Sequence, residues 1–213
     1  MNTLHSIVQR RGAVPLAAFT GERVYMRPIQ PGKPLPFDLA RWQPTVDAML
    51  NGIDADVAYL MIDQARVAAG VSHRRPGVHI DGYWNPGLSA HAPEPTHGSS
   101  PPPRDSHSGS PRHMGGARGW APDTSYLAPE GLLLVSSITA ARAYAGQFDR
   151  RPGDGGDCSH LDVSAMQALD MEAGVVYAGN VTMLHESLPV PMDCLRTVVR
   201  LNVPGWTPER SHA

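Results

Sequence analysis

The sequence predicts a mainly β protein, a sandwich or jelly-roll barrel with a few flanking helices, and three observations support this. The chain has 213 residues, which suits one domain with a proper hydrophobic core. Its regular segments are short apolar or alternating runs of strand length. Turns that contain Gly and Pro separate these runs, as is typical of sandwiches and jelly rolls.

The first regular segments lie before residue 78. Residues 44–52 predict a short helix, with Thr45 near its start and Gly52 at its end. Residues 57–67 are apolar and partly β-branched, which favours a strand. Residues 163–171 fit either a helical turn or a strand. The strands expected in the last part of the chain are residues 131–138, 174–184 and 194–203.

A long stretch at about 85–119 interrupts these segments. It is rich in Pro, Gly and Ser and cannot bury a core. We interpret residues 1–213 as one domain that carries this stretch as a loop insertion. A loop of this length is either a functional lid or a disordered insertion, and the sequence leaves both open. Its four histidines are irregularly spaced and predict no metal site.

Composition argues against several classes of partner. With 18 Lys and Arg against 20 Asp and Glu, the net charge of −2 gives no strong nucleic-acid signal and no attraction to an anionic membrane. No segment approaches the roughly 20 apolar residues of a membrane span. The two cysteines, Cys158 and Cys194, form no disulfide or zinc motif. We therefore expect a cytoplasmic protein that acts on a small-molecule or other organic substrate; the sequence does not indicate its oligomeric state.

The segment from Arg74 to Trp84 contains the most informative motif, His79-Ile80-Asp81. Residues two apart on a strand project to the same face, so an imidazole and a carboxylate would lie side by side. His185, at the end of a later expected strand, is the candidate third ligand. Two histidines and one carboxylate form the facial triad of non-haem Fe(II) oxygenases, which leaves the other metal positions open.

A short motif of this kind also arises by chance, and the chain contains a rival, His160-Leu161-Asp162. Only about two dozen residues separate this rival from His185. That interval leaves little room for the intervening strands of a barrel. The rival also follows a Gly- and Asp-rich loop, so we prefer His79 and Asp81.

The order of these features resembles the Fe(II)/2-oxoglutarate-dependent dioxygenase superfamily, whose fold is the double-stranded β-helix. The resemblance covers roughly residues 59–203: an early His-x-Asp, a Gly-bounded strand that leads to the distal His185, and a final strand that contains Arg196 and Arg200. It implies Fe(II) and O₂ as cofactors, with 2-oxoglutarate as co-substrate.

The resemblance also implies that an arginine of the final strand binds the far carboxylate of 2-oxoglutarate. Arg196 and Arg200 are four residues apart and face the same side of a strand. We favour Arg196, because the shorter interval from the distal histidine is the commoner arrangement in that superfamily. Thr197 and Tyr177 are expected to add hydroxyl donors nearby.

Two other functions remain open at this point. One is a cupin-type metalloenzyme that does not use 2-oxoglutarate, although such sites generally contain more histidines. The other is a non-catalytic jelly-roll protein with a binding or structural role. The substrate cannot be read from the sequence, and the outcome could be hydroxylation, desaturation or demethylation.

Overall fold

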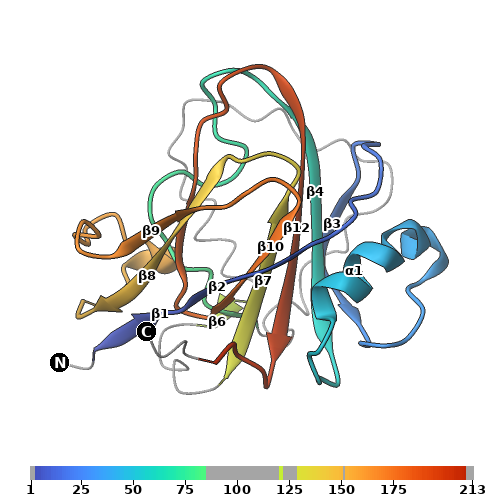
Figure 1. Ribbon diagram of the computed structural model, residues 1–213, viewed down its shortest axis with the longest axis horizontal. Coiled ribbons are helices and arrows are strands. Elements are labelled where there is room, and N and C mark those ends of the chain that lie inside the picture. Colours follow the sequence, from blue (N-terminus) through green and yellow to red (C-terminus); the bar gives the residue numbers. More distant parts are fainter. Residues whose placement is uncertain (1–2, 85–119, 122–128, 151, 210–213) are drawn as a thin grey trace.

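A computed structural model describes residues 3–84, 120–121, 129–150 and 152–209 (Figure 1). These residues form two antiparallel β-sheets and a separate short strand pair. The large sheet has the strand order β2 (Val8–Ala13), β10 (Val175–Asn180), β7 (Glu130–Ser136), β12 (Cys194–Pro204), β4 (Ala58–Val67) and β3 (Arg23–Ile29). The small sheet contains β1 (Leu4–Ser6), β8 (Ala141–Phe148), β9 (Gln167–Asp170) and β11 (Leu184–Ser187). The short pair is β5 (Tyr83–Trp84) with β6 (Trp120–Ala121).

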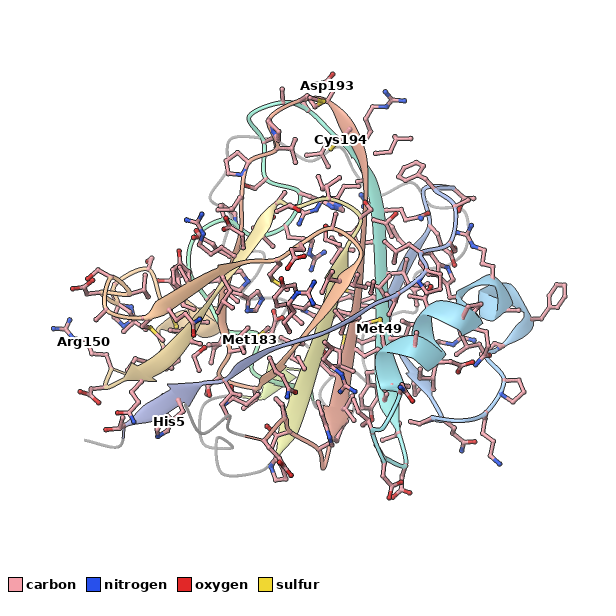
Figure 2. All side chains as sticks on the ribbon, viewed as in Figure 1. His5, Met49, Arg150, Met183, Asp193 and Cys194 are labelled. Carbon is pink, nitrogen blue, oxygen red and sulfur yellow. The ribbon has the colours of Figure 1, made fainter. Side chains whose placement is uncertain are left out.

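Helical segments cover one face of the large sheet, which we call the outer face. They are η1 (Phe37–Trp42) and α1 (Gln43–Leu50). A short 3₁₀ turn, η5 (Asp154–Gly156), is not part of this layer. Trp42 and Met49 are fully buried in the same core as Leu60 and Leu201 of the sheet. Figure 2 shows Met49 on this side. Burial of one such side chain contributes roughly 1.5–3 kcal/mol, which explains why a helix of eight residues is stable here.

The inner face of the large sheet packs against the small sheet. Leu134 and Tyr177 of the large sheet share a core with Ala143 of β8 and with Met183, which precedes β11. In Figure 2 Met183 lies in the layer between the sheets, and in Figure 1 β8 and β9 lie on the opposite side of the large sheet from α1. The two sheets therefore enclose a layer of side chains, and the candidate site lies in this layer.

Residues 78–80 continue the small sheet beyond β11. His79 forms bridges with His185 on one side and with Asp157 on the other. Gly156 permits the second contact: its φ is +79°, and a Cβ at this position would lie 2.3 Å from the carbonyl oxygen of Ile80. Only glycine accepts both conditions without displacement of the neighbouring segment.

Most of the expected elements are present. The helix at 44–52 is α1, and the strands at 57–67, 131–138 and 194–203 are β4, β7 and β12. The expected strand at 174–184 is two strands, because a turn at 180–183 separates β10 from β11. The ambiguous stretch contains β9, while β1, β2, β3 and β8 were not anticipated.

The prediction of a mainly β fold is confirmed, but the expected barrel is not closed: the strands in the described ranges form separate open sheets. The expected insertion at 85–119 lies outside the described residues. Among the described helices, none has the length and apolar character needed to cross a membrane.

Candidate metal centre

His79 and His185 are placed together by the backbone. The amide N–H of each residue donates to the carbonyl of the other, at 3.0 Å in both directions. Such a hydrogen-bonded antiparallel pair has its two side chains on the same face. The alternation of residues 78–81 turns Val78 and Ile80 to an apolar cluster on the far side of the small sheet, and it leaves His79 and Asp81 on the side of the large sheet.

One ligand atom from each of His79, Asp81 and His185 lies within 4.8 Å of the other two. The imidazole centroids are 4.5 Å apart, and both histidines are buried. A transition metal with bonds of about 2.0–2.2 Å needs ligand atoms roughly 3 Å apart on one face. The three ligand atoms are close to this spacing, so the three residues can hold one ion.

Both histidines are oriented as metal ligands by the backbone. Nδ1 of His79 lies 2.8 Å from the carbonyl oxygen of Gly77, and Nδ1 of His185 lies 3.0 Å from that of Met183. A carbonyl oxygen only accepts, so each Nδ1 carries a proton and Nε2 is the nitrogen left to bind a metal. Burial, with a further contribution from His185, lowers the pKa of His79 to about 3, which keeps this imidazole neutral.

Asp81 is held in its ionised form by Arg200. The guanidinium Nη1 of Arg200 donates to Oδ2 of Asp81 at 2.7 Å, and Nε2 of His185 lies 3.5 Å from the same oxygen. Burial alone would raise the pKa of Asp81, but Arg200 and the two histidines hold it well below its usual range. The centre thus offers one nitrogen from each imidazole and one anionic oxygen.

Arg196 lies on the same inner face of β12 as Arg200 but has different surroundings. It is 1% exposed, and in the described part of the chain its hydrogen bonds go to two serine hydroxyls rather than to a carboxylate. Nε donates to Ser136 and Nη1 donates to Ser187, both at 3.1 Å. Burial lowers the pKa of Arg196 to about 10, as expected for a cation that is only partly compensated.

The two serines add donors to this cationic position. Ser187 also accepts a hydrogen bond from the amide of Arg74, and Ser136 accepts one from the amide of Ile138. Each hydroxyl therefore receives two N–H donors, and among the described residues neither has an acceptor for its own proton. The arginine and the two hydroxyls form a group of donors that is complementary to an anion.

Two expected co-substrate ligands are not brought to this position. The prediction for Thr197 is wrong, because adjacent strand residues face opposite sides: its hydroxyl accepts from Gln64 on the outer face, 3.1 Å away. Tyr177 lies on the inner face, but its hydroxyl bonds to the segment at Asp170 and Glu172. Its proton is therefore committed to that segment.

Among the described residues, the rival motif is not part of a group that could hold a metal ion. His160 and Asp162 are exposed in a turn, and Asp162 accepts from the amide of Ser164. Arg74 and Arg75, which follow the first part of the chain, pair with Asp63 and Asp157 respectively. Ser187 was not anticipated as a site residue, although its position two residues after His185 places it on the same face.

Comparisons with protein-family models, with curated proteins and with solved structures found no match to this chain.

Proposed function

We propose that this protein is a non-haem Fe(II) oxygenase that uses 2-oxoglutarate and O₂ to oxidise an organic substrate. One observation carries the proposal: a buried facial set of two histidines and one aspartate faces a buried arginine that has no carboxylate partner in the described ranges. Two neutral imidazoles and one carboxylate on one face are the usual protein ligands of Fe(II) in this enzyme class.

The order of the side chains on β12 supports the proposal for 2-oxoglutarate. Arg196, Val198 and Arg200 follow one another on the inner face of this strand, at intervals of about 6–7 Å. Arg196 would bind the far carboxylate, and the apolar Val198 would contact the two methylene groups. The 2-oxo acid end would then reach the metal centre, which lies opposite Arg200.

When bound, the iron supplies the redox chemistry that joins decarboxylation to oxidation of the substrate. The overall reaction converts 2-oxoglutarate, O₂ and a C–H group to succinate, CO₂ and a C–OH group, and it needs no other reductant. The chain holds the ion with three side chains, keeps Asp81 ionised through Arg200, and fixes the co-substrate through Arg196, Ser136 and Ser187.

The same side chains favour a jelly-roll relative of the double-stranded β-helix. The ligands come from the small sheet and from the segment that extends it, and the anion-binding arginine comes from the middle of the large sheet. Residues from two facing sheets thus support a metal site between them. It agrees with the order of motifs in the sequence.

The test is formation of succinate from 2-oxoglutarate in air, with Fe(II) added to purified metal-free protein. We expect slow Fe(II)-dependent turnover even without the substrate, and we expect its loss in His185→Ala but not in His160→Ala. Iron binding without any succinate would favour a cupin-type enzyme of another activity. Failure to bind any divalent metal would favour a non-catalytic binding or structural role.

A further inference from the structure

The edge strand β3 contains a β-bulge. Its register with β4 shifts by one residue between Val24 and Arg27, so Tyr25 and Met26 together occupy the position opposite a single residue of β4. Among the described residues, Met26 is the only one other than glycine with a positive φ, at +48°. This left-handed conformation is unfavourable for a residue with a Cβ, so the surrounding contacts must maintain it.

The bulge sends its two side chains in different directions. Tyr25 is 50% exposed, whereas Met26 is 4% exposed and packs with Met61 and Val198. Met61 of β4 lies directly opposite Arg200 of β12, and β3, β4 and β12 are neighbouring strands of the large sheet (Figure 1). Met26 therefore lies on the inner face, in line with Met61 and Arg200.

The end of the Met26 side chain contacts the guanidinium of Arg200. Nη2 of Arg200 donates to Sδ of Met26 at 3.5 Å, and Nη1 of the same group donates to Oδ2 of Asp81 at 2.7 Å. The guanidinium is planar and rigid, so a contact that fixes Nη2 also fixes the direction of Nη1. Met26 is thus connected to the candidate metal ligand Asp81 through one rigid group.

A thioether suits this position. It is long, unbranched and uncharged, and its sulfur accepts a weak hydrogen bond. A carboxylate at the same point would compete with Asp81 for the guanidinium, and an aliphatic side chain would fill the space without an acceptor for Nη2. The sulfur of Met26 can therefore orient Arg200 and leave its pair with Asp81 intact.

We propose that Met26 is a positioning residue of the metal centre: the bulge in β3 directs its thioether onto Arg200, and Arg200 in turn orients the carboxylate of Asp81 toward the metal. This inference rests on the metal centre of the proposed function, but not on the identity of the co-substrate. It also accounts for the unfavourable backbone at Met26, because a bulge that redirects a side chain is a common feature beside active sites.

The test is binding of Co(II), whose visible spectrum reports the geometry of its ligands. Met26→Leu keeps most of the side-chain volume and removes the sulfur, and Met49→Leu makes the same change in the core on the outer face. We expect Met26→Leu to bind Co(II) about 3-fold more weakly than the wild type and to alter the spectrum, an effect smaller than the roughly 10–100-fold of a ligand's direct partner. Met49→Leu should change neither. Equal affinity and equal spectra in the two variants would overturn the inference.

Met26→Gly and Met26→Ala separate positioning from stability. Both remove the thioether, but only glycine also relieves the backbone, so the alanine variant should unfold at a lower urea concentration. We expect the two to bind Co(II) equally, up to about 10-fold more weakly than the wild type. Tighter binding by the glycine variant, in step with its stability, would leave Met26 a purely structural role and contradict the inference. The predicted pattern in a protein that never converts 2-oxoglutarate would retain the inference and contradict only the oxygenase proposal.

Discussion

The regions around Arg196 and Arg200 differ in a way that their sequences do not reveal. Both arginines are buried on the same face of β12, only four residues apart. Arg200 is paired with the carboxylate of Asp81, whereas Arg196 contacts two serine hydroxyls. A buried cation with a carboxylate partner stabilises the site, and one without such a partner in the described part of the chain is suited to bind an anion from solution. The hydrogen-bond partner of each arginine, and not the residue type, therefore indicates whether the arginine supports a metal ligand or binds an anion.

The largest expected effect comes from removal of a metal ligand. His185→Ala should reduce affinity for Fe(II) by more than the roughly 10–100-fold that loss of a ligand's outer hydrogen-bond partner costs. His160→Ala is the matched control, since His160 is exposed in a turn. Metal content after dialysis against a weak chelator measures both. Equal iron in the two variants would contradict the assignment of His185.

Substitution of the two arginines should affect the binding of different ligands. Arg196→Ala should weaken binding of 2-oxoglutarate by about 2–5 kcal/mol, or about 30-fold or more, while metal affinity is retained. Arg200→Ala should do the reverse, because it releases Asp81 and so weakens metal binding about 10–100-fold. Calorimetric titrations of metal and of 2-oxoglutarate into each variant test this crossed pattern. If Arg200→Ala is the change that weakens 2-oxoglutarate binding in metal-saturated protein, the two roles are exchanged.

Substitution of Gly156 tests whether its close contact with Ile80 holds the segment that contains His79 and Asp81 in place. Gly156→Ala combines an unfavourable φ with a clash against the carbonyl of Ile80, and should cost about 2–4 kcal/mol. Gly174→Ala meets the same φ penalty in open space and should cost only about 1–2 kcal/mol. Urea denaturation measures both values. Equal destabilisation would show that the contact between residues 156 and 80 does not constrain the site.

A smaller effect is expected in the pH dependence of the metal-free protein. The pKa of His79 is lowered to about 3 in the folded state, so between pH 6.5 and about 4 the unfolded chain binds one more proton at this residue. The free energy of unfolding should therefore fall by about 1.4 kcal/mol for each pH unit of acidification in this window. His79→Asn should flatten the dependence, and His160→Asn should not. An unchanged slope in His79→Asn would show that another group is responsible.

The sequence predicted the parts of this molecule that depend on local alternation. The period of two places His79 with Asp81 and Arg196 with Arg200 on common faces, and apolar runs correspond to β4, β7 and β12. Strict use of this alternation would have excluded Thr197 as a ligand, because Thr197 and Arg196 are adjacent and face opposite sides of the strand. What alternation could not give is which strands lie together: the pairing of His79 with His185 and the approach of Asp81 to Arg200 depend on contacts across more than 100 residues.

The strands that were missed have weak local signals. β2 contains Arg10 and Arg11, and β8 alternates small and polar residues, so neither has the apolar character of a central strand. They are stabilised as partners of β10 and β11, which sequence patterns cannot show.

The most direct test of the account is visible spectroscopy of the protein with Fe(II) and 2-oxoglutarate in the absence of O₂. Chelation of iron by the 2-oxo acid produces a weak charge-transfer band, and this band reports the metal centre and the anion position together. We expect the band to appear in the wild type, to saturate at one 2-oxoglutarate per iron, and to require a much higher concentration in Arg196→Ala. A wild-type protein that binds one Fe(II) and shows no band at any 2-oxoglutarate concentration would contradict the account.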